Sequence, residues 1–222
     1  MFDNYDFLDK YWSLFLQGVE VTIVLAVISI LLGLVLGILV ALLKMSKIKP
    51  VSLLASMYVG FIRDTPLLVQ IYLVYIGLPK IVGVSIPDFV TGLVALTLYS
   101  TAYIAEIIRS GIQSLPVGQV EAATSLGMPQ VRVMTDIVLP QAFKNILPAL
   151  GNQFIGNIKD SSLVSVLGIT DLMFAAQTVR GSTALGLEPM IVASGLYLVM
   201  TWSLNRLLNL FERRMRASDR TS

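Results

Sequence analysis

The stretch VTIVLAVISILLGLVLGILVALL, which runs from Val21 to Leu43, contains 23 consecutive residues without a charged side chain. A helix of this length can cross the hydrocarbon core of a bilayer, which is roughly 30 Å thick. A helix on the surface of a soluble core keeps one polar face, and this stretch has none. The stretch therefore predicts a membrane-spanning helix, and with it an integral membrane protein.

The composition of the whole chain points to the same class. Hydrophobic residues make up 55% of the 222 residues and charged residues 14%, against about 25% charged in soluble domains. Cysteine and histidine are absent, which removes disulfides, the usual zinc ligands and the Cys/His nucleophile pairs. A Gly-x-x-x-x-Gly-Lys-[Ser/Thr] phosphate loop is also absent, so ATP hydrolysis by that route is not expected. We predict no metal site, no resident cofactor and no nucleic-acid partner for this chain.

Hydropathy predicts a single all-α transmembrane domain over residues 1–222, with about five spans. The spans are expected at about residues 19–43, 51–78, 87–107, 138–166 and 188–210. A short loop is expected at 79–86, and residues 163–187 fit an outer loop, a re-entrant segment or part of a longer helix. Residues 1–18 predict an external amphipathic segment at the interface, because charged residues there alternate with Phe2, Tyr5, Phe7, Tyr11, Trp12 and Phe15.

Basic residues concentrate on one side of these spans. The segments on that side contain Lys44, Lys47 and Lys49, then Arg109, Arg132 and Lys144, then Arg213, Arg214, Arg216 and Arg220. The segments on the other side contain Lys10, Lys80 and Arg180. The positive-inside rule then predicts a multi-pass protein of the cytoplasmic (inner) membrane, with the N-terminus outside and the C-terminus in the cytoplasm.

The segment between the third and fourth spans, residues 117–136, carries the strongest functional signal. Its first part is rich in alanine and predicts a short helix ended by Gly127 as a left-handed cap. A second helix is predicted to begin near Met128 or Pro129, with Pro129 in a first-turn position. A compact helix–glycine–helix unit on the cytoplasmic side has a shape that can seat in a partner's groove.

This segment resembles the E-A-A-x3-G-x9-I-x-L-P motif of the membrane subunits of ABC importers. The motif is complete, as Glu121, Ala122, Ala123, Gly127, Ile137, Leu139 and Pro140. Residues 63–70, Arg-Asp-Thr-Pro-Leu-Leu-Val-Gln, are similar to the R-G-T-P-L-L-V-Q motif of polar amino-acid permeases of the histidine/glutamine/arginine type. Asp64 stands where that family commonly has glycine. The resemblance extends over roughly residues 12–216.

The resemblance implies the transmembrane-domain fold of type I ABC importers, and uptake of arginine, lysine, histidine, glutamine or glutamate. It also implies that residues 117–136 contain the coupling helix, which docks on a separate ATPase, with Glu121 as a polar contact and Gly127 as the turn. The implied partners are two ATP-binding subunits that hold ATP and magnesium, a second membrane subunit (another copy or a paralogue) and an extracytoplasmic amino-acid-binding protein.

Two pairs of ionisable residues lie within the predicted spans, where each charge costs at least a few kcal/mol and is a functional candidate. Arg63 and Asp64 interrupt the second span. Thr65 followed by Pro66 predicts that the helix breaks and restarts there, with Thr65 as N-cap and Pro66 at the first position. Restarted helices direct free N–H groups at substrate carboxylates in other transporters.

We therefore hypothesise that the backbone of residues 65–67, together with Arg63, receives the α-carboxylate of an amino acid. The structural alternative is that Arg63 and Asp64 neutralise each other, or pair with Glu106 or Lys159. The second pair, Lys159 and Asp160, has polar neighbours that predict a path-lining helix face. Glu106 also fits an interfacial charge paired with Arg109, and Tyr103 also fits core packing. The full set of substrate-path candidates is Arg63, Asp64, Thr65, Pro66, Gln70, Tyr103, Glu106, Asn157, Lys159, Asp160 and Ser161.

Two other functions use similar residues. An ion-gradient-driven secondary amino-acid transporter accounts for the spans and the buried charges, but not for the complete motif, and five spans without an internal repeat fit it poorly. An intramembrane hydrolase would need paired carboxylates, such as Asp64 with Asp160, or a Ser–Lys arrangement of Lys159 with Ser161 or Ser162.

Overall fold

The computed structural model describes residues 6–218, and every regular element in this range is a helix. Phe2 and Tyr5 of the predicted external segment, and the side chains of Arg214, Arg216 and Arg220 at the predicted inner end, lie outside the described residues. The α-helices are α1 (Phe7–Lys44), α2 (Lys49–Asp64), α3 (Leu67–Val82), α4 (Asp88–Gln113), α5 (Val117–Ser125), α6 (Gln130–Arg132), α7 (Leu139–Asp160), α8 (Leu172–Thr183) and α9 (Glu188–Ser218). A π-helical turn, η1 (Val133–Val138), joins α6 to α7, and a 3-10 turn, η2 (Ser161–Leu167), follows α7.

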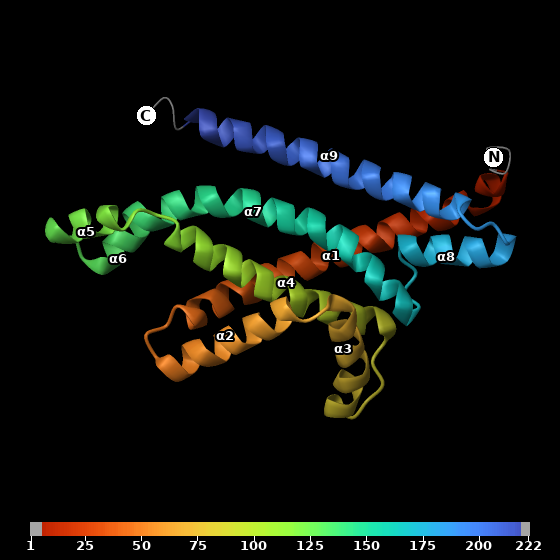
Figure 1. The fold of residues 1–222 in the computed structure, drawn as a ribbon, viewed down its shortest axis with the longest axis horizontal. Helices are drawn as coiled ribbons and strands as arrows, with labels where there is room; N and C mark the ends of the chain where they lie inside the picture. The colour runs from red at the N-terminus through yellow and green to blue at the C-terminus, as the bar shows by residue number, and fades with distance from the viewer. Residues whose placement is uncertain (1–5, 219–222) are drawn as a thin grey trace.

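The long helices extend side by side along the molecule. Figure 1 shows α1, α4, α7 and α9 along the long axis, α5 and α6 at one end, and α8 at the other end beside the start of α1. Within the described residues, α1, α4 and α9 are each long and apolar enough to cross a membrane. The number is five if each of two bent pairs is one span: α2 with α3, bent by 115°, and the helical stretch 130–167 with α8, bent by 48°. The predicted all-α membrane class is confirmed.

The first helix differs from the prediction. An external segment separate from the first span was expected up to residue 18, but α1 is one helix of 38 residues, about 57 Å long. Phe7, Phe15 and Gly18 are buried, and the two phenylalanines pack with residues of α8 and α9. At Gly18 an added Cβ would lie 2.8 Å from the Cα of Leu172 in α8. Contacts with α8 and α9 therefore help to hold this part of the chain in a helix.

Helices α1 and α4 approach closely along the two glycines of α1. A Cβ on Gly33 would lie 2.8 Å from the Cβ of Ser100, and one on Gly37 would lie 2.8 Å from the side chain of Ile104. Small residues four positions apart let two membrane helices pack with short backbone separation. The pair α1 and α4 is thus the central packing contact on which the other helices are placed.

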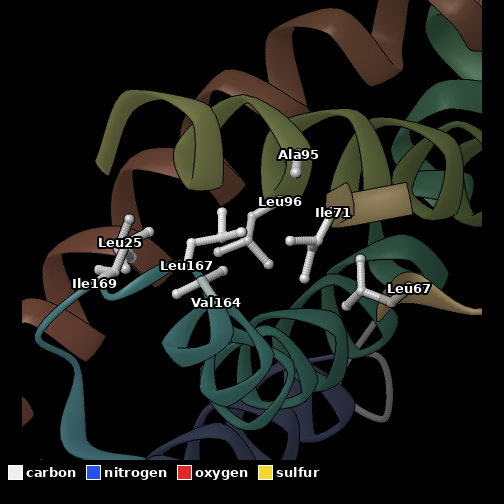
Figure 2. Packing of buried hydrophobic residues seen from close by; sticks show 8 residues of the cluster. All are labelled: Leu25, Leu67, Ile71, Ala95, Leu96, Val164, Leu167 and Ile169. Atoms are coloured by element: carbon white, nitrogen blue, oxygen red, sulfur yellow. The ribbon is translucent and has the colours of Figure 1, made fainter. Parts of the chain in front are cut away.

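A buried apolar cluster fixes the start of α3 against this pair. In Figure 2 the side chains converge from α1, α3, α4, η2 and the link between η2 and α8: Leu25, Leu67, Ile71, Ala95, Leu96, Val164, Leu167 and Ile169. Only the beginning of α3 takes part, and the rest of the helix points away from the molecule (Figure 1).

The corner between α2 and α3 has the predicted break, but two details differ from the prediction. The two helices meet at an angle of 115°. Thr65 does not cap α3: it follows α2, its hydroxyl donates to the carbonyl of Phe61 at 2.7 Å, and Pro66 occupies the N-cap of α3. The helix also continues through Pro79 to Val82, where Gly83 ends it with φ +78°. The loop is therefore shorter than the predicted 79–86.

Residues 163–187 form η2, a short link and the separate helix α8. Asp171, fully buried, caps α8 by accepting a hydrogen bond from the N–H of Phe174 at 2.9 Å, and its other oxygen faces the Tyr197 hydroxyl of α9 at 3.4 Å. The N–H of Leu172 donates to Thr22 of α1 at 3.1 Å. The bend of 48° between the helical stretch 130–167 and α8 fits either a broken continuation of α7 or a re-entrant segment.

Candidate functional site

The turn after α5 has the predicted left-handed cap. Gly127 has φ +78°, its N–H donates to the carbonyl of Thr124 at 3.0 Å, and the N–H of Met128 donates to that of Ala123 at 3.1 Å. These two bonds make a Schellman motif, in which the left-handed residue is usually glycine. A Cβ at Gly127 would meet no atom within 4 Å, so the backbone angle, not space, favours glycine here.

Helices α5 and α6 with η1 form one small body, which we call the knob (residues 117–138). Its core contains buried Ala123, Val133 and Val138, packed with Ile112, Leu115, Val120, Met128 and Ile137. The tight turn brings α5 back onto η1, so the knob has its own apolar core. An apolar hollow of about 400 Å³ remains between its helices and the end of α4.

The motif residues divide between the inside and the outside of the knob. Ala123 faces the core, whereas Glu121 and Ala122 are exposed. Two large apolar side chains are also exposed, Leu126 at 84% and Val131 at 74%. Within the described part of the chain, no hydrogen bond or ion pair is recorded for the Glu121 carboxylate. The knob thus exposes both a carboxylate and apolar side chains.

The end of the motif leads directly into α7. Ile137 lies in the knob core, Leu139 is exposed and Pro140 occupies the first turn of α7, where its missing N–H costs no hydrogen bond. Pro129 lies at the N-cap of α6, one residue before its predicted place. The predicted second helix is therefore α6, η1 and α7 in succession.

A second candidate site gathers around Glu106 of α4. Its carboxylate accepts from Lys44 of α1 at 2.7 Å and from two nitrogens of Arg109 at 3.1 and 2.5 Å. Arg63, at the end of α2, approaches the same carboxylate at 3.5 Å. One anion thus joins three helices and three cations. The predicted Glu106–Arg109 pair is present, and Arg63 pairs with Glu106 rather than with Asp64.

A cavity of about 490 Å³ opens beside this cluster. Its lining includes Arg63, Tyr103 and Glu106, and on the other side Ser110, Ser114 and Asn145, with Ile107, Gly111 and Ala149 completing it. Since three cations surround one carboxylate, the charged side of this cavity has an excess of positive charge.

A series of side chains leads from this cavity to Asp160. The Arg63 guanidinium lies 5.8 Å from the ring centroid of Tyr103, and the Tyr99 ring lies 4.6 Å from that of Tyr103. The Tyr99 hydroxyl and the Asp160 carboxylate interact with each other. A cation and a carboxylate thus stand at the two ends of a tyrosine pair, across α2, α4 and α7.

The other candidates at the α2–α3 corner have structural contacts. Gln70 is buried, and its amide nitrogen donates to the carbonyls of Ile62 and Thr65 at 2.7 and 3.0 Å and to the Thr65 hydroxyl at 2.9 Å. Its amide oxygen is buried without a partner. Asp64 and Pro66 are exposed. Gln70 and Thr65 therefore hold the corner together and place Arg63 at its end.

Two path candidates in and after α7 do not face open space. Asn157 is fully buried and hydrogen-bonded to Ser29 and Ser100. Ser161 is also fully buried, and its hydroxyl donates to the carbonyl of Ile158 at 2.8 Å. Lys159 is exposed. Of the predicted polar face, Asp160 alone joins the tyrosine series.

Sequence reasoning missed Tyr99 and the role of Lys44. Tyr99 stands four residues before Tyr103, a spacing that places both rings on one helix face, so this signal was available. Lys44 had been assigned only to the basic loop, and its pairing with Glu106, 62 residues away, has no local signal.

Residues 33–217 match the protein family described as the inner membrane component of binding-protein-dependent transport systems. The chain belongs to this family. It is a multi-pass membrane subunit of that class, and the predicted kinship with importer permeases is confirmed.

Individual relatives cover the chain from end to end. The arginine transport system permease protein ArtQ of Bacillus subtilis (strain 168) is 41% identical over 204 residues, 92% of this chain and 93% of the relative. The probable glutamine ABC transporter permease protein GlnM of the same organism is 40% identical, covering 98% of this chain and 97% of the relative.

Solved structures share the fold. A chain from the crystal structure of an amino acid ABC transporter with histidines superimposes with a TM-score of 0.91 at 46% identity, over 96% of this chain and all of that chain. The MetNI methionine ABC transporter, at 20% identity and a TM-score of 0.76, shows the fold alone. The predicted type I importer fold is confirmed, and neither the ion-gradient-driven transporter nor the hydrolase gains support.

Proposed function

We propose that this chain is the permease subunit of an ABC importer that takes up a polar or charged amino acid of the arginine/lysine/histidine or glutamine/glutamate group. The observation that carries the proposal is the end-to-end similarity, at about 40% identity, to relatives named for arginine and for glutamine transport. The chain itself is not the enzyme in this proposal. ATP and magnesium bind to separate ATPase subunits.

The knob is the part that couples the permease to the ATPase. Exposed Leu126 and Val131 supply apolar contact area, and the unpaired Glu121 carboxylate supplies one polar contact. An exposed apolar surface on a polar body is typical of an interaction site. In this proposal the knob lies in the cytoplasm, which the excess of basic residues on this side of the spans favours, and two such knobs meet two ATPase subunits.

Helix α3 supports the presence of a second membrane subunit. Its buried side chains are Leu67, Gln70 and Ile71, all in its first two turns, and Leu73, Ile76 and Ile81 farther along are exposed. The helix points away from the rest of the chain (Figure 1). A second copy or a paralogue covers α3 in this proposal, and an extracytoplasmic amino-acid-binding protein docks at the α8 end.

The substrate is recognised by its two opposite charges. Arg63 receives the α-carboxylate, together with first-turn N–H groups of α3, which have no partner within the helix. Asp160 receives the α-ammonium or a cationic side chain, and the rings of Tyr99 and Tyr103 lie between. Glu106 is already shared by Lys44, Arg63 and Arg109, so Asp160 is the acidic group left for a cationic ligand.

The test is ATP hydrolysis by the complex, with the ATPase and binding protein, reconstituted in lipid and supplied with a panel of amino acids. We expect stimulation by one or two polar amino acids. We expect Glu121→Gln to lower it through the knob and Asp160→Asn to raise the half-stimulating concentration. A complex that binds no ATPase, or one that no amino acid stimulates, contradicts the proposal.

A further inference from the structure

A buried polar node joins three helices in the middle of the bundle. The amide nitrogen of Asn157 in α7 donates to the Ser29 hydroxyl at 2.7 Å and to the carbonyl of Ala26 at 3.3 Å, both in α1. Its amide oxygen accepts from the Ser100 hydroxyl of α4 at 3.2 Å. Asn157, Ser29 and Ser100 are fully buried.

The close packing of α1 and α4 keeps the node in place. A Cβ on Gly33 would lie 2.8 Å from the Cβ of Ser100, so the two helices touch beside the node. The Ser29 hydroxyl also donates to the carbonyl of Leu25 at 2.6 Å, which leaves its oxygen as the acceptor for Asn157. Both partners of the amide are thus held by helices that pack on each other.

The node lies one turn before two consecutive residues of opposite charge. Residues three or four positions apart share a helix face, and residues two apart do not. Asp160 and Ser161 therefore lie on the face of Asn157, whereas Lys159 lies on the opposite face. Lys159 is exposed, and Asp160 is partly buried against Tyr99.

A rotation of α7 by one residue, about 100°, would exchange the two charges. The hydrophobic effect is non-directional, whereas hydrogen bonds constrain angle as well as distance. Asn145 of α7 also donates a hydrogen bond, to Ser114 at the end of α4. It is exposed and lies twelve positions before Asn157. Asn157, closer to the charged pair, is fully buried and bonds to both α1 and α4.

We propose that Asn157 is a positioning residue that sets the rotation of α7, so that Asp160 and not Lys159 faces the tyrosine series. This inference rests on the proposed function, in which that series recognises the substrate. In this proposal Asn157, about one helical turn before Asp160, determines which charge the path presents to the substrate. With Asn157 in place the path presents a carboxylate, and it favours a cationic group on the substrate.

The rotation is tested with cysteine probes, because the chain has no cysteine of its own. Lys159→Cys and Asp160→Cys are each combined with Asn157→Leu, which keeps the branched shape and the number of heavy atoms and removes the amide. Asn152→Leu, at an exposed asparagine of the same helix, is the matched control. The labelling rates of the two cysteines with a water-soluble maleimide are compared in the assembled complex.

We expect Asn157→Leu to change the ratio of the two rates at least fivefold and Asn152→Leu to leave it unchanged. An unchanged ratio in both overturns the proposal. Where Asn157→Leu does not assemble, Ser29→Ala and Ser100→Ala each remove one arm of the node and are read by the same ratio.

Selectivity is measured in the same variants without the cysteines. We expect Asn157→Leu to raise the half-stimulating concentration of a cationic amino acid about tenfold, with smaller effect on a neutral one and an unchanged maximal ATPase rate. A changed labelling ratio with an unchanged preference overturns the role in selectivity. If no amino acid stimulates the parent complex, the proposed function fails, and the labelling ratio still decides the role of Asn157.

Discussion

Replacing Gly127 by alanine tests whether the shape of the knob controls coupling. Gly127 has φ +78°, and an added Cβ would meet no atom within 4 Å. The free-energy cost of the substitution therefore comes from the backbone conformation alone. A left-handed conformation costs an L-residue roughly 1–2 kcal/mol, which lowers the population of the turn by a factor of about 5–30. Gly118→Ala is the matched control: its Cβ also meets nothing, but it lies within α5, where alanine favours the helix by about 0.5–1 kcal/mol.

The assay is substrate-stimulated ATP hydrolysis of the reconstituted complex, together with the amount of ATPase that copurifies. We expect a large loss of stimulation for Gly127→Ala and none for Gly118→Ala. Gly127→Asn should fall between them, since asparagine tolerates the left-handed region better than alanine. Equal stimulation in the alanine variants at 127 and 118 would refute the reasoning, because it would mean that the left-handed turn is not needed for coupling.

Three further substitutions test the packing that places these sites. Glu106→Gln leaves three cations without their shared carboxylate. We expect the free energy of unfolding to fall by about 1.5–3 kcal/mol, the range for hydrogen bonds to charged groups. A lower thermal midpoint in detergent for Glu106→Gln, with the midpoint of Glu20→Gln unchanged, would support this. Gly37→Val places a Cβ 2.8 Å from a branched side chain of α4 and should cost about 1–3 kcal/mol by overpacking, whereas Gly77→Val, with open space, should leave the midpoint within error. Asp171→Ala removes the cap of α8, at a cost of about 1 kcal/mol, and we expect faster proteolysis after α8. Asp171→Asn keeps an oxygen that can cap the helix, so we expect its cleavage rate to stay near that of the parent. Equal cleavage of the two variants would argue against the cap.

The main helices follow from the sequence because their signals are local. An uncharged run as long as residues 21–43 has few alternatives to a membrane helix, and the breaks at Thr65 and Gly127 are marked by residues with restricted or permissive backbones. What could not be predicted depends on contacts distant in sequence. The start of α1 is helical because Phe7 and Phe15 pack on α8 and α9, and no local pattern distinguishes this from an interfacial segment.

In the candidate sites, too, local contacts could be predicted from the sequence and distant ones could not. The Schellman turn was predictable because its residues lie within six positions of one another. The cluster at Glu106 was only half predictable, because Arg109 lies one turn away but Lys44 and Arg63 come from other helices. Asn157 was assigned to the path on polarity alone. The structure instead buries it against Ser29, 128 residues away, because a buried amide in an apolar bundle must find hydrogen-bond partners.

Helix α7 connects the two candidate sites. It begins at Leu139, directly after the knob, and ends at Asp160 beside Tyr99, with 22 residues over about 33 Å. A movement of the knob can be transmitted along α7 to its other end. If that movement also rotated α7 about its axis, Lys159 would replace Asp160 beside Tyr99. The bonds of Asn157 to α1 and α4 oppose such a turn. The π-helical turn η1, a kind of feature found often at functional sites, belongs to the core of the knob and runs directly into α7. In the proposed importer, this division of roles would let the ATPase move the path while its charge preference stays the same.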